Sequence, residues 1–262
     1  MSVKILCPAK LNLFLAVGPI DHRKYHPIRS IFQAISLYDE LELTPSTQLT
    51  FECNDPSVPT ENTVTKACRL LMEVVDFPPV HAKLTKNIPS EAGLGGGSSD
   101  AAGVLRASRQ LMTMAMPLYE QKAIAKAIGA DVTFFLTGGR AKVEGYGEQV
   151  SKIDSPSSPE WYVVAQPEDR CSTAEAYAKL DALSYEWRDF PTEDILYNDF
   201  ERAAPCGSLE LLERLLVHGA KDSGLTGSGS AVFGRFSSEA DATAAADRLR
   251  SEAPFVAVAH SL

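Results

Sequence analysis

The apolar positions in the first 17 residues predict a β-strand. In the segment VKILCPAKLNLFLAV, residues 3–17, leucines at alternate positions share one face of an extended chain. Lys10, Asn12 and Phe14 share the opposite face. Lys10 and Asn12 therefore lie side by side on one face of a mostly apolar strand.

Helical and extended patterns follow one another along the rest of the chain. Residues 61–75 place apolar side chains three and four positions apart, which predicts a helix with Asn62 or Thr63 at its N-cap. Further segments predict, in chain order, one or two strands over 30–43, a strand over 81–89, a helix from Ser99 or Asp100 to Met112, a helix over 119–131 closed at Gly129, a hairpin over 138–150, a strand over 161–166, helices over 173–182 and 208–217, a strand over 231–236, a helix over 237–253 and a last strand over 255–261.

The order of these elements lacks the steady strand–helix alternation of a doubly wound parallel sheet. A proline- and serine-rich break, DSPSSPE at 154–160, is the best candidate for a domain boundary. It predicts an N-terminal domain over 1–155 and a C-terminal domain over 156–262.

Composition and charge narrow the class of protein. The chain has 262 residues, of which 45% are hydrophobic, and this supports a sizeable core. The formal net charge of −9 disfavours a large nucleic-acid-binding surface. Lys4 and Lys10 interrupt the apolar N-terminus, so we expect no signal peptide, and no apolar run is long enough to predict a membrane span. Five scattered cysteines without a CxxC pair indicate reduced thiols and a cytoplasmic protein.

A glycine-rich segment, GLGGGSSD at 93–100, follows a predicted strand and precedes a predicted helix. It lacks the lysine of a Walker A loop and the last glycine of the dinucleotide fingerprint. Its glycines nevertheless let backbone N–H groups approach an anion, and the helix N-terminus and the two serines add further donors. The segment is therefore either a phosphate-binding loop or a flexible turn followed by a serine N-cap.

A second glycine-rich segment, GLTGSGS at 224–230, precedes a strand. Alone it could be a turn or a β-bulge. Two such segments in one chain, each flanked by regular structure, suggest a site that is closed from two sides.

Several single residues carry two interpretations each. Lys10 is either a surface lysine at a strand edge or, with Asn12, part of a polar pair facing one ligand. Asp131 is either the N-cap of a short following helix or a functional carboxylate. Tyr25 and His26 are either exposed loop residues or a stacking surface for a ligand.

Taken together, these motifs resemble those of the GHMP small-molecule kinases. The segments that carry the resemblance are PAKLNLFLAV, YHPIRSIFQAISLYDELEL, IPSEAGLGGGSSDAA, GADVTFFLTGGRAKVEGYGE, NDFE (198–201) and GLTGSGSAVFG. They occur in the order of that family and cover nearly the whole chain. PAKLNLFL with YH downstream is typical of the branch that phosphorylates a cytidine-diphosphate-linked methylerythritol in the non-mevalonate route to isoprenoids.

The resemblance implies a fold and a cofactor. The fold would be α+β, with a ribosomal-S5-like N-terminal domain, a ferredoxin-like C-terminal domain, and ATP and substrate between them. Mg²⁺ is expected with ATP; a loop serine is a candidate ligand, and no acidic ligand is assigned. The ATP phosphates would be held by Gly93, Gly95, Gly96, Gly97, Ser98 and Ser99, and Asn62 and Lys86 match positions near the adenine.

The resemblance also assigns the chemistry. Lys10 and Asp131 match the catalytic pair of the family. Tyr25 and His26 match residues that hold the cytosine, and Tyr177 matches the aromatic residue on its other face. Asn12 is a candidate substrate-binding residue beside Lys10.

The chain departs from the family pattern at one turn and in its length. The branch usually has DGYH where this chain has RKYH, so charge replaces glycine at this turn. The chain is also somewhat short between residues 44 and 60 and in its C-terminal half.

Other functions stay open at this point. The chain could be another GHMP kinase, acting on mevalonate phosphates or homoserine, although an aromatic clamp is unnecessary for such substrates. It could be a catalytically silent nucleotide-binding protein, against which the presence of both Lys10 and Asp131 argues. An RNA-binding S5-like module is disfavoured by the acidic charge.

Overall fold

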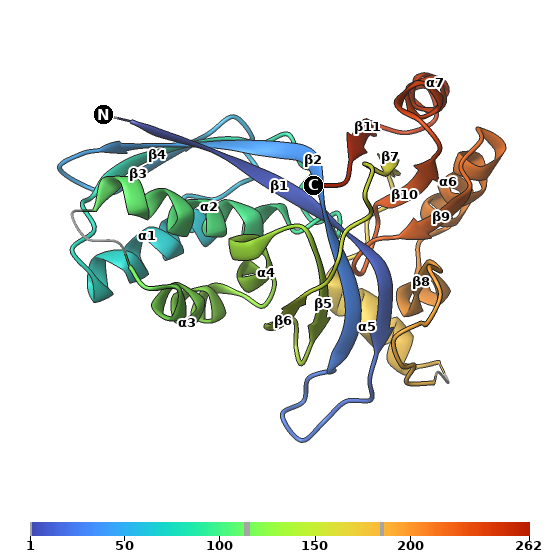
Figure 1. Cartoon of the computed structure of the whole chain (residues 1–262), viewed down its shortest axis with the longest axis horizontal. Helices are drawn as coiled ribbons and strands as arrows, with labels where there is room; N and C mark the ends of the chain where they lie inside the picture. The colour runs from blue at the N-terminus through green and yellow to red at the C-terminus, as the bar shows by residue number, and fades with distance from the viewer. Residues whose placement is uncertain (1, 113–115, 184–185) are drawn as a thin grey trace. The chain divides into compact units, whose positions relative to one another are not determined.

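The computed structural model describes residues 2–112, 116–183 and 186–262 (Figure 1). The chain divides into two compact units. Each unit combines separate stretches of the chain. Unit 1 consists of Met1–Ala9, Tyr38–Ile88 and Gly95–Gly138, and unit 2 consists of Lys10–Leu37, Pro89–Leu94 and Gly139–Leu262. The predicted domains over 1–155 and 156–262 stay a prediction.

Each unit combines helices with strands, and most of the strand pairs are antiparallel, as expected of the α+β class. The strands are β1 (Val3–Val17), β2 (Ile28–Pro45), β3 (Thr50–Cys53), β4 (Val80–Thr85), β5 (Arg140–Glu144), β6 (Gln149–Lys152), β7 (Trp161–Gln166), β8 (Tyr197–Asn198), β9 (Asp222–Leu225), β10 (Val232–Phe236) and β11 (Phe255–His260). The helices are α1 (Thr63–Val74), α2 (Gly96–Leu111), α3 (Leu118–Ile128), α4 (Val132–Thr137), α5 (Thr173–Asp181), α6 (Cys206–Val217), α7 (Glu239–Leu249) and the 3₁₀ helix η1 (Asp199–Ala203).

In unit 1, a sheet is covered by the helices α1–α4, which pack against one another (Figure 1). β4 pairs antiparallel with β2 and parallel with β3, and Leu41 lies opposite Leu84 in the register. Helix α2 approaches β1 closely through Gly103, because a Cβ atom there would lie 2.5 Å from the Cys7 sulfur. The glycine is therefore required by close packing.

In unit 2, β5 pairs antiparallel with β2 and with β6, and β8 pairs parallel with β1. A separate antiparallel sheet has the strand order β11-β7-β10-β9, and α6 and α7 pack against it. Its core includes Val163 and Val232 from the strands, Leu215 from α6 and Leu249 from α7. Burial of each such side chain stabilises the folded state by about 1.5–3 kcal/mol.

Most predicted elements are confirmed. The segment 3–17 is one strand, and Asn62 caps α1 by accepting hydrogen bonds from the backbone N–H groups of Val64 and Thr65. Helix α3 ends before Gly129, and the hairpin over 138–150 forms as β5 and β6. None of the described helices is long and apolar enough to span a bilayer.

Several element ends differ from their predicted positions, among them the end of α7 at Leu249 instead of residue 253, and two of these differences bear on the site. Helix α2 begins at Gly96 instead of Ser99 or Asp100, because its N-cap is Gly95 in the left-handed conformation, with φ of 72°. The glycine run therefore forms the first turn of the helix, and no serine N-cap exists there. Strand β4 ends at Thr85 instead of residue 89, because the N–H groups of Asn87 and Ile88 donate to the Asp39 carboxylate and leave the sheet.

Candidate active site

Lys10 is buried in unit 2, with 3% of its surface exposed. Its ammonium group donates to the side-chain oxygen of Asn12 and to the carbonyl oxygen of Gly93, and it lies 5.0 Å from the centroid of the Phe32 ring. A buried ammonium group needs such acceptors, because burying its charge without hydrogen-bond partners costs roughly several kcal/mol. The structure thus excludes the interpretation of Lys10 as an exposed lysine at a strand edge.

Asn12 connects Lys10 to the second glycine-rich segment. Its side-chain oxygen accepts hydrogen bonds from the N–H of Gly227 at 2.7 Å and from the Thr226 hydroxyl at 3.2 Å. Its side-chain nitrogen donates to the Ser30 hydroxyl at 2.9 Å. The amide is therefore held at both ends by protein groups, and its position fixes that of Lys10.

Within unit 2, Gly93 of the first glycine-rich segment lies against Thr226 and Gly227 of the second. A Cβ atom on Gly93 would lie 2.1 Å from the carbonyl oxygen of Thr226, and one on Gly227 would lie 2.8 Å from the Gly93 Cα. Both glycines have positive φ, 78° and 58°. No other residue fits this contact without moving the backbone.

The NDFE motif, residues 198–201, anchors the second segment. The Asn198 side chain donates to the carbonyl oxygens of Leu225 and Gly227 at 2.8 and 2.9 Å. The Glu201 carboxylate accepts from the Leu225 N–H at 2.9 Å, and burial raises the pKa of Glu201. The motif thus positions the second glycine-rich segment.

In unit 1, the N-terminus of α2 offers donors to an anion. The first N–H groups of any helix lack partners within the helix, and the helix dipole favours negative charge there. The Ser99 hydroxyl is fully buried and has no hydrogen-bond partner among the described residues. Gly97 is exposed, and its carbonyl oxygen accepts from the Thr63 hydroxyl at 2.6 Å.

A second buried lysine, Lys86, lies beneath this helix terminus. Its ammonium group forms ion pairs with Asp39 and, at 3.1 Å, with Asp100. The lysine side chain is 7% exposed, and the two carboxylate side chains are at most 2% exposed. Gly96 lies directly on this group, because a Cβ atom there would lie 3.0 Å from the Lys86 nitrogen.

Electrostatics in this cluster follow from burial and charge. Burial opposes the charged form of Lys86, but the carboxylates of Asp100 and Asp39 outweigh it and raise the lysine pKa. Burial raises the pKa of Asp100 to about 7, aided by Asp39 and opposed by Lys86. One Asp100 oxygen also lacks a hydrogen-bond partner within the described part of the chain.

Two further predicted residues of unit 1 lie at helix starts. Asn62 is engaged locally, since its oxygen caps α1 and its nitrogen donates to the Pro59 carbonyl oxygen at 2.8 Å. Asp131 is half-buried and precedes α4, and its side chain makes no capping hydrogen bond to the described residues of that helix. Asp131 therefore occupies the N-cap position of α4, as one interpretation predicted, but its carboxylate does not cap the helix.

All three predicted base-binding residues belong to unit 2, and two of them, His26 and Tyr177, are in ring contact. The His26 ring stacks on the Tyr177 ring, with centroids 5.0 Å apart and an angle of 27°. Its Nδ1 lies 2.8 Å from the Gly18 carbonyl oxygen and its Nε2 lies 3.3 Å from an Asp181 carboxylate oxygen. Tyr25 is 67% exposed, which leaves much of its ring available to a ligand.

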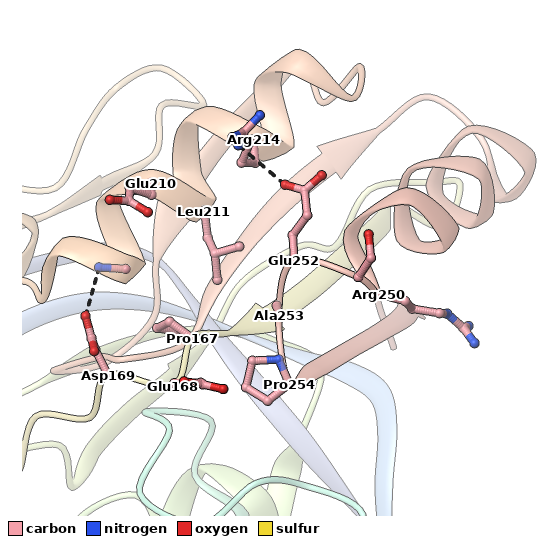
Figure 2. Close-up of a pocket in the computed structure, with 12 residues that line it drawn as sticks. Pro167, Glu168, Asp169, Glu210, Leu211, Arg214, Arg250, Glu252, Ala253 and Pro254 are labelled. Atoms are coloured by element: carbon pink, nitrogen blue, oxygen red, sulfur yellow. Dashed lines mark hydrogen bonds and ion pairs between the residues drawn. The ribbon is translucent and has the colours of Figure 1, made fainter.

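A surface pocket of about 580 Å³ lies elsewhere in unit 2 (Figure 2). Residues 167–169, the start of α6 and the turn after α7 line it. Asp169 accepts from the Gly207 N–H at 3.3 Å, and Arg214 pairs with Glu252 at 3.4 Å. The pocket includes none of the residues that the sequence analysis assigns to ATP or substrate.

Comparison with family models finds two matches in this chain. The model described as "GHMP kinases N terminal domain" matches residues 62–139, which include the first glycine-rich segment. The model described as "GHMP kinases C terminal" matches residues 208–254, which include the second.

The chain is similar over most of its length to named kinases. A 4-diphosphocytidyl-2-C-methyl-D-erythritol kinase of Polaromonas naphthalenivorans is 37% identical over 92% of this chain and 88% of its own length. A crystal structure of 4-(cytidine 5'-diphospho)-2C-methyl-D-erythritol kinase has a TM-score of 0.86 and 31% identity, covering 99% of both chains. A homoserine kinase from Cytophaga hutchinsonii has a TM-score of 0.73 at 19% identity, covering 100% of this chain and 94% of its own, a likeness of fold alone.

Proposed function

The chain belongs to the GHMP kinase family, and from this premise we propose that it transfers the γ-phosphoryl group of ATP to a hydroxyl of 4-diphosphocytidyl-2-C-methyl-D-erythritol. The observation that carries the proposal is the similarity to kinases of this name over nearly the whole chain, in sequence and in fold. The buried Lys10 and the aromatic group around His26 and Tyr177 suit a kinase with a nucleotide-linked substrate.

The transfer needs positioning and charge stabilisation more than covalent chemistry. In the proposed mechanism, Asp131 orients the acceptor hydroxyl or accepts its proton. Lys10 pairs with Asp131, keeps it ionised, and stabilises the negative charge that develops on the acceptor oxygen. The hydrogen bonds from Lys10 to Asn12 and Gly93 hold its ammonium group in a fixed place for this role.

The phosphates of ATP are proposed to lie at Gly93–Ser99. This placement is supported by the N-terminus of α2 and by the Ser99 hydroxyl, a buried donor with no hydrogen-bond partner among the described residues. Hydroxyl and phosphate oxygens are the ligands that Mg²⁺ prefers, so these residues fit Mg²⁺–ATP, and the ion would neutralise phosphate charge. Among the described residues, no group of three His, Cys, Asp or Glu side chains could hold a metal. We therefore infer that phosphate oxygens and water supply most of its ligands.

The remaining predicted residues receive proposed roles in the same way. Asn62 and Lys86 are proposed to lie near the adenine, with Lys86 also fixing the start of α2 through its carboxylate partners. For the substrate, Tyr25 and Tyr177 are proposed to cover the faces of the cytosine. His26 is proposed to lie at its edge, and Asn12 to serve this site by positioning Lys10.

One assay separates this function from its alternatives. Purified enzyme with ATP and Mg²⁺ is given 4-diphosphocytidyl-2-C-methyl-D-erythritol, homoserine or phosphomevalonate in separate reactions, and ADP release is measured. We expect ADP only with the cytidine-linked alcohol. Equal turnover of another alcohol would reassign the enzyme within the family, and no turnover of any would indicate a silent nucleotide-binding protein.

A further inference from the structure

The loop between β1 and β2 carries two of the proposed substrate residues, Tyr25 and His26. Its base is closed by a hydrogen bond of 2.7 Å from the Gly18 N–H to the Pro27 carbonyl oxygen. At its tip, the Asp21 N–H donates to the Tyr25 carbonyl oxygen at 3.0 Å. The tip is thus a compact turn that ends at the exposed tyrosine.

This turn contains a residue in an unfavourable conformation. Lys24 has a φ of 62°, in the left-handed region that favours glycine. The family branch that the chain resembles usually has glycine at this position. A lysine there raises the free energy of the folded turn, so the turn requires other contacts to hold it.

The Asp21 carboxylate supplies those contacts. One oxygen accepts hydrogen bonds from the N–H groups of Arg23 and Tyr25, at 2.9 and 3.4 Å. The other oxygen accepts from the hydroxyl of Tyr146, which lies 125 residues further along the chain. This hydroxyl bond lowers the pKa of Asp21 and raises the pKa of Tyr146, so the acceptor is ionised and the donor protonated at neutral pH.

Tyr146 also contacts the loop with its ring. The Tyr25 ring meets it edge-on, with centroids 6.0 Å apart and an angle of 66°. The Arg23 guanidinium lies 5.7 Å from its centroid. Tyr146 itself is fixed in the turn between β5 and β6, where its N–H donates to the Glu148 carboxylate at 2.8 Å.

We propose that Asp21 and Tyr146 are positioning residues for the nucleobase of the substrate. Tyr146 holds the Asp21 carboxylate, and Asp21 holds the turn that presents Tyr25. Burial does not fix an exposed ring such as that of Tyr25, so the turn and the Tyr146 ring must set its orientation. The inference rests on the proposed function, because it takes Tyr25 as a contact of the cytidine group.

The central test is Tyr146→Phe, which removes the hydroxyl and keeps the ring. We expect the affinity for cytidine 5'-diphosphate, measured by calorimetry, to fall about three- to tenfold, which is less than the roughly tenfold or greater loss for a hydrogen bond to a charged group, because Tyr146 acts on the base only through the turn. The KM for the cytidine-linked alcohol should rise by the same factor. The kcat and the KM for ATP should stay nearly unchanged, because the base is remote from the transferred phosphoryl group.

A second readout follows the loop without any ligand. Trypsin cleaves after lysine and arginine, and the loop exposes Arg23 and Lys24. Tyr146→Phe should accelerate cleavage at these two residues. The matched control is Tyr119→Phe, because Tyr119 is exposed and its hydroxyl also donates to a carboxylate, that of Glu120, at 2.9 Å. The control should change neither cleavage nor affinity.

A double variant tests whether the two residues act as one unit. Asp21→Ala should weaken cytidine diphosphate binding at least as much as Tyr146→Phe, and the double variant should be no worse than Asp21→Ala alone. Independent, multiplying effects would overturn the inference, as would wild-type affinity in a folded Tyr146→Phe variant. A wild-type enzyme that fails to bind cytidine diphosphate would instead overturn the proposed function.

Discussion

Two buried lysines, Lys86 in unit 1 and Lys10 in unit 2, have different surroundings. Lys86 lies between the carboxylates of Asp39 and Asp100, beneath the start of α2. The hydrogen bonds described for Lys10 go to neutral oxygens, those of Asn12 and the Gly93 carbonyl. The contacts described for the two lysines thus differ in kind: carboxylates for Lys86, and neutral oxygens with the Phe32 ring for Lys10.

The difference predicts what each lysine does. Without Lys86, two buried carboxylates would lose their countercharge, and one Asp100 oxygen already has no hydrogen-bond partner among the described residues. Without Lys10, the Asn12 oxygen would keep its donors from Thr226 and Gly227. We therefore expect Lys86 to contribute more to the stability of the fold than Lys10, whose proposed role is in the chemistry of the site.

The largest effect is expected at the proposed partner of Lys10. Asp131→Asn is nearly isosteric, so the fold and both ligand affinities should persist, while kcat falls by about 10²–10⁴-fold through loss of a positioned acid–base group. Steady-state kinetics with both substrates saturating measures this change. A variant that keeps more than about a tenth of kcat would remove Asp131 from the catalytic pair.

The next effect concerns stability. Lys86→Met should lower the free energy of unfolding by about 3–5 kcal/mol, because breaking a buried ion pair leaves unpaired charge in the core. Urea unfolding followed by circular dichroism measures this loss. Lys83→Met is a suitable control, since the Lys83 ammonium group is exposed and its pair with Glu52 lies on the surface. Equal losses in the two variants would contradict the structural role of Lys86.

A smaller effect separates two neighbouring glycines. Gly96→Ala should cost about 1–3 kcal/mol of stability, because its Cβ would press on the fixed Lys86 nitrogen and on Ile88. Gly97→Ala should change stability little, since its Cβ would only touch Thr63 at 3.4 Å. Thermal unfolding measures the stability of both variants. Equal melting temperatures would show that the Lys86 side chain does not restrict position 96 to glycine.

The last effect is a change in pH dependence. The pKa of Asp100 is raised from 3.8 to about 7 in the folded protein, so the native state holds a proton that the unfolded state has lost. This group therefore makes stability fall as pH rises from about 4 to about 7. The Asp100→Asn variant has no titrating group at this position. Its free energy of unfolding should therefore fall less between pH 5 and pH 8 than that of the wild type. Parallel curves for variant and wild type would contradict the assigned shift.

The sequence predicted the surroundings of Lys10 better than those of Lys86. Alternation along β1 was enough to place Lys10 and Asn12 on one face, because residues two apart in a strand share a face. Lys86 is joined to Asp39 and Asp100 across 47 and 14 residues, and no local pattern signals such a contact. Composition alone offered no sign that these aspartates are buried.

Local rules also failed where tertiary contacts decide the backbone. The start of α2 was placed at the serines, since serine is a good N-cap, but Gly95 takes that position in a left-handed conformation. The bond between Asp21 and Tyr146 spans 125 residues, and the only sequence signal near it was the departure at RKYH. That departure now has a physical description, a lysine with positive φ in a turn held by a distant tyrosine.

The most direct test of the difference between the two lysines is Lys10→Met, with kcat and the free energy of unfolding measured on the same preparation. The account predicts that kcat falls by about 10²–10⁴-fold while stability falls by less than in Lys86→Met, because the Asn12 and Gly93 oxygens keep other donors. A Lys10→Met enzyme that keeps more than about a tenth of kcat, or that loses as much stability as Lys86→Met, would contradict it.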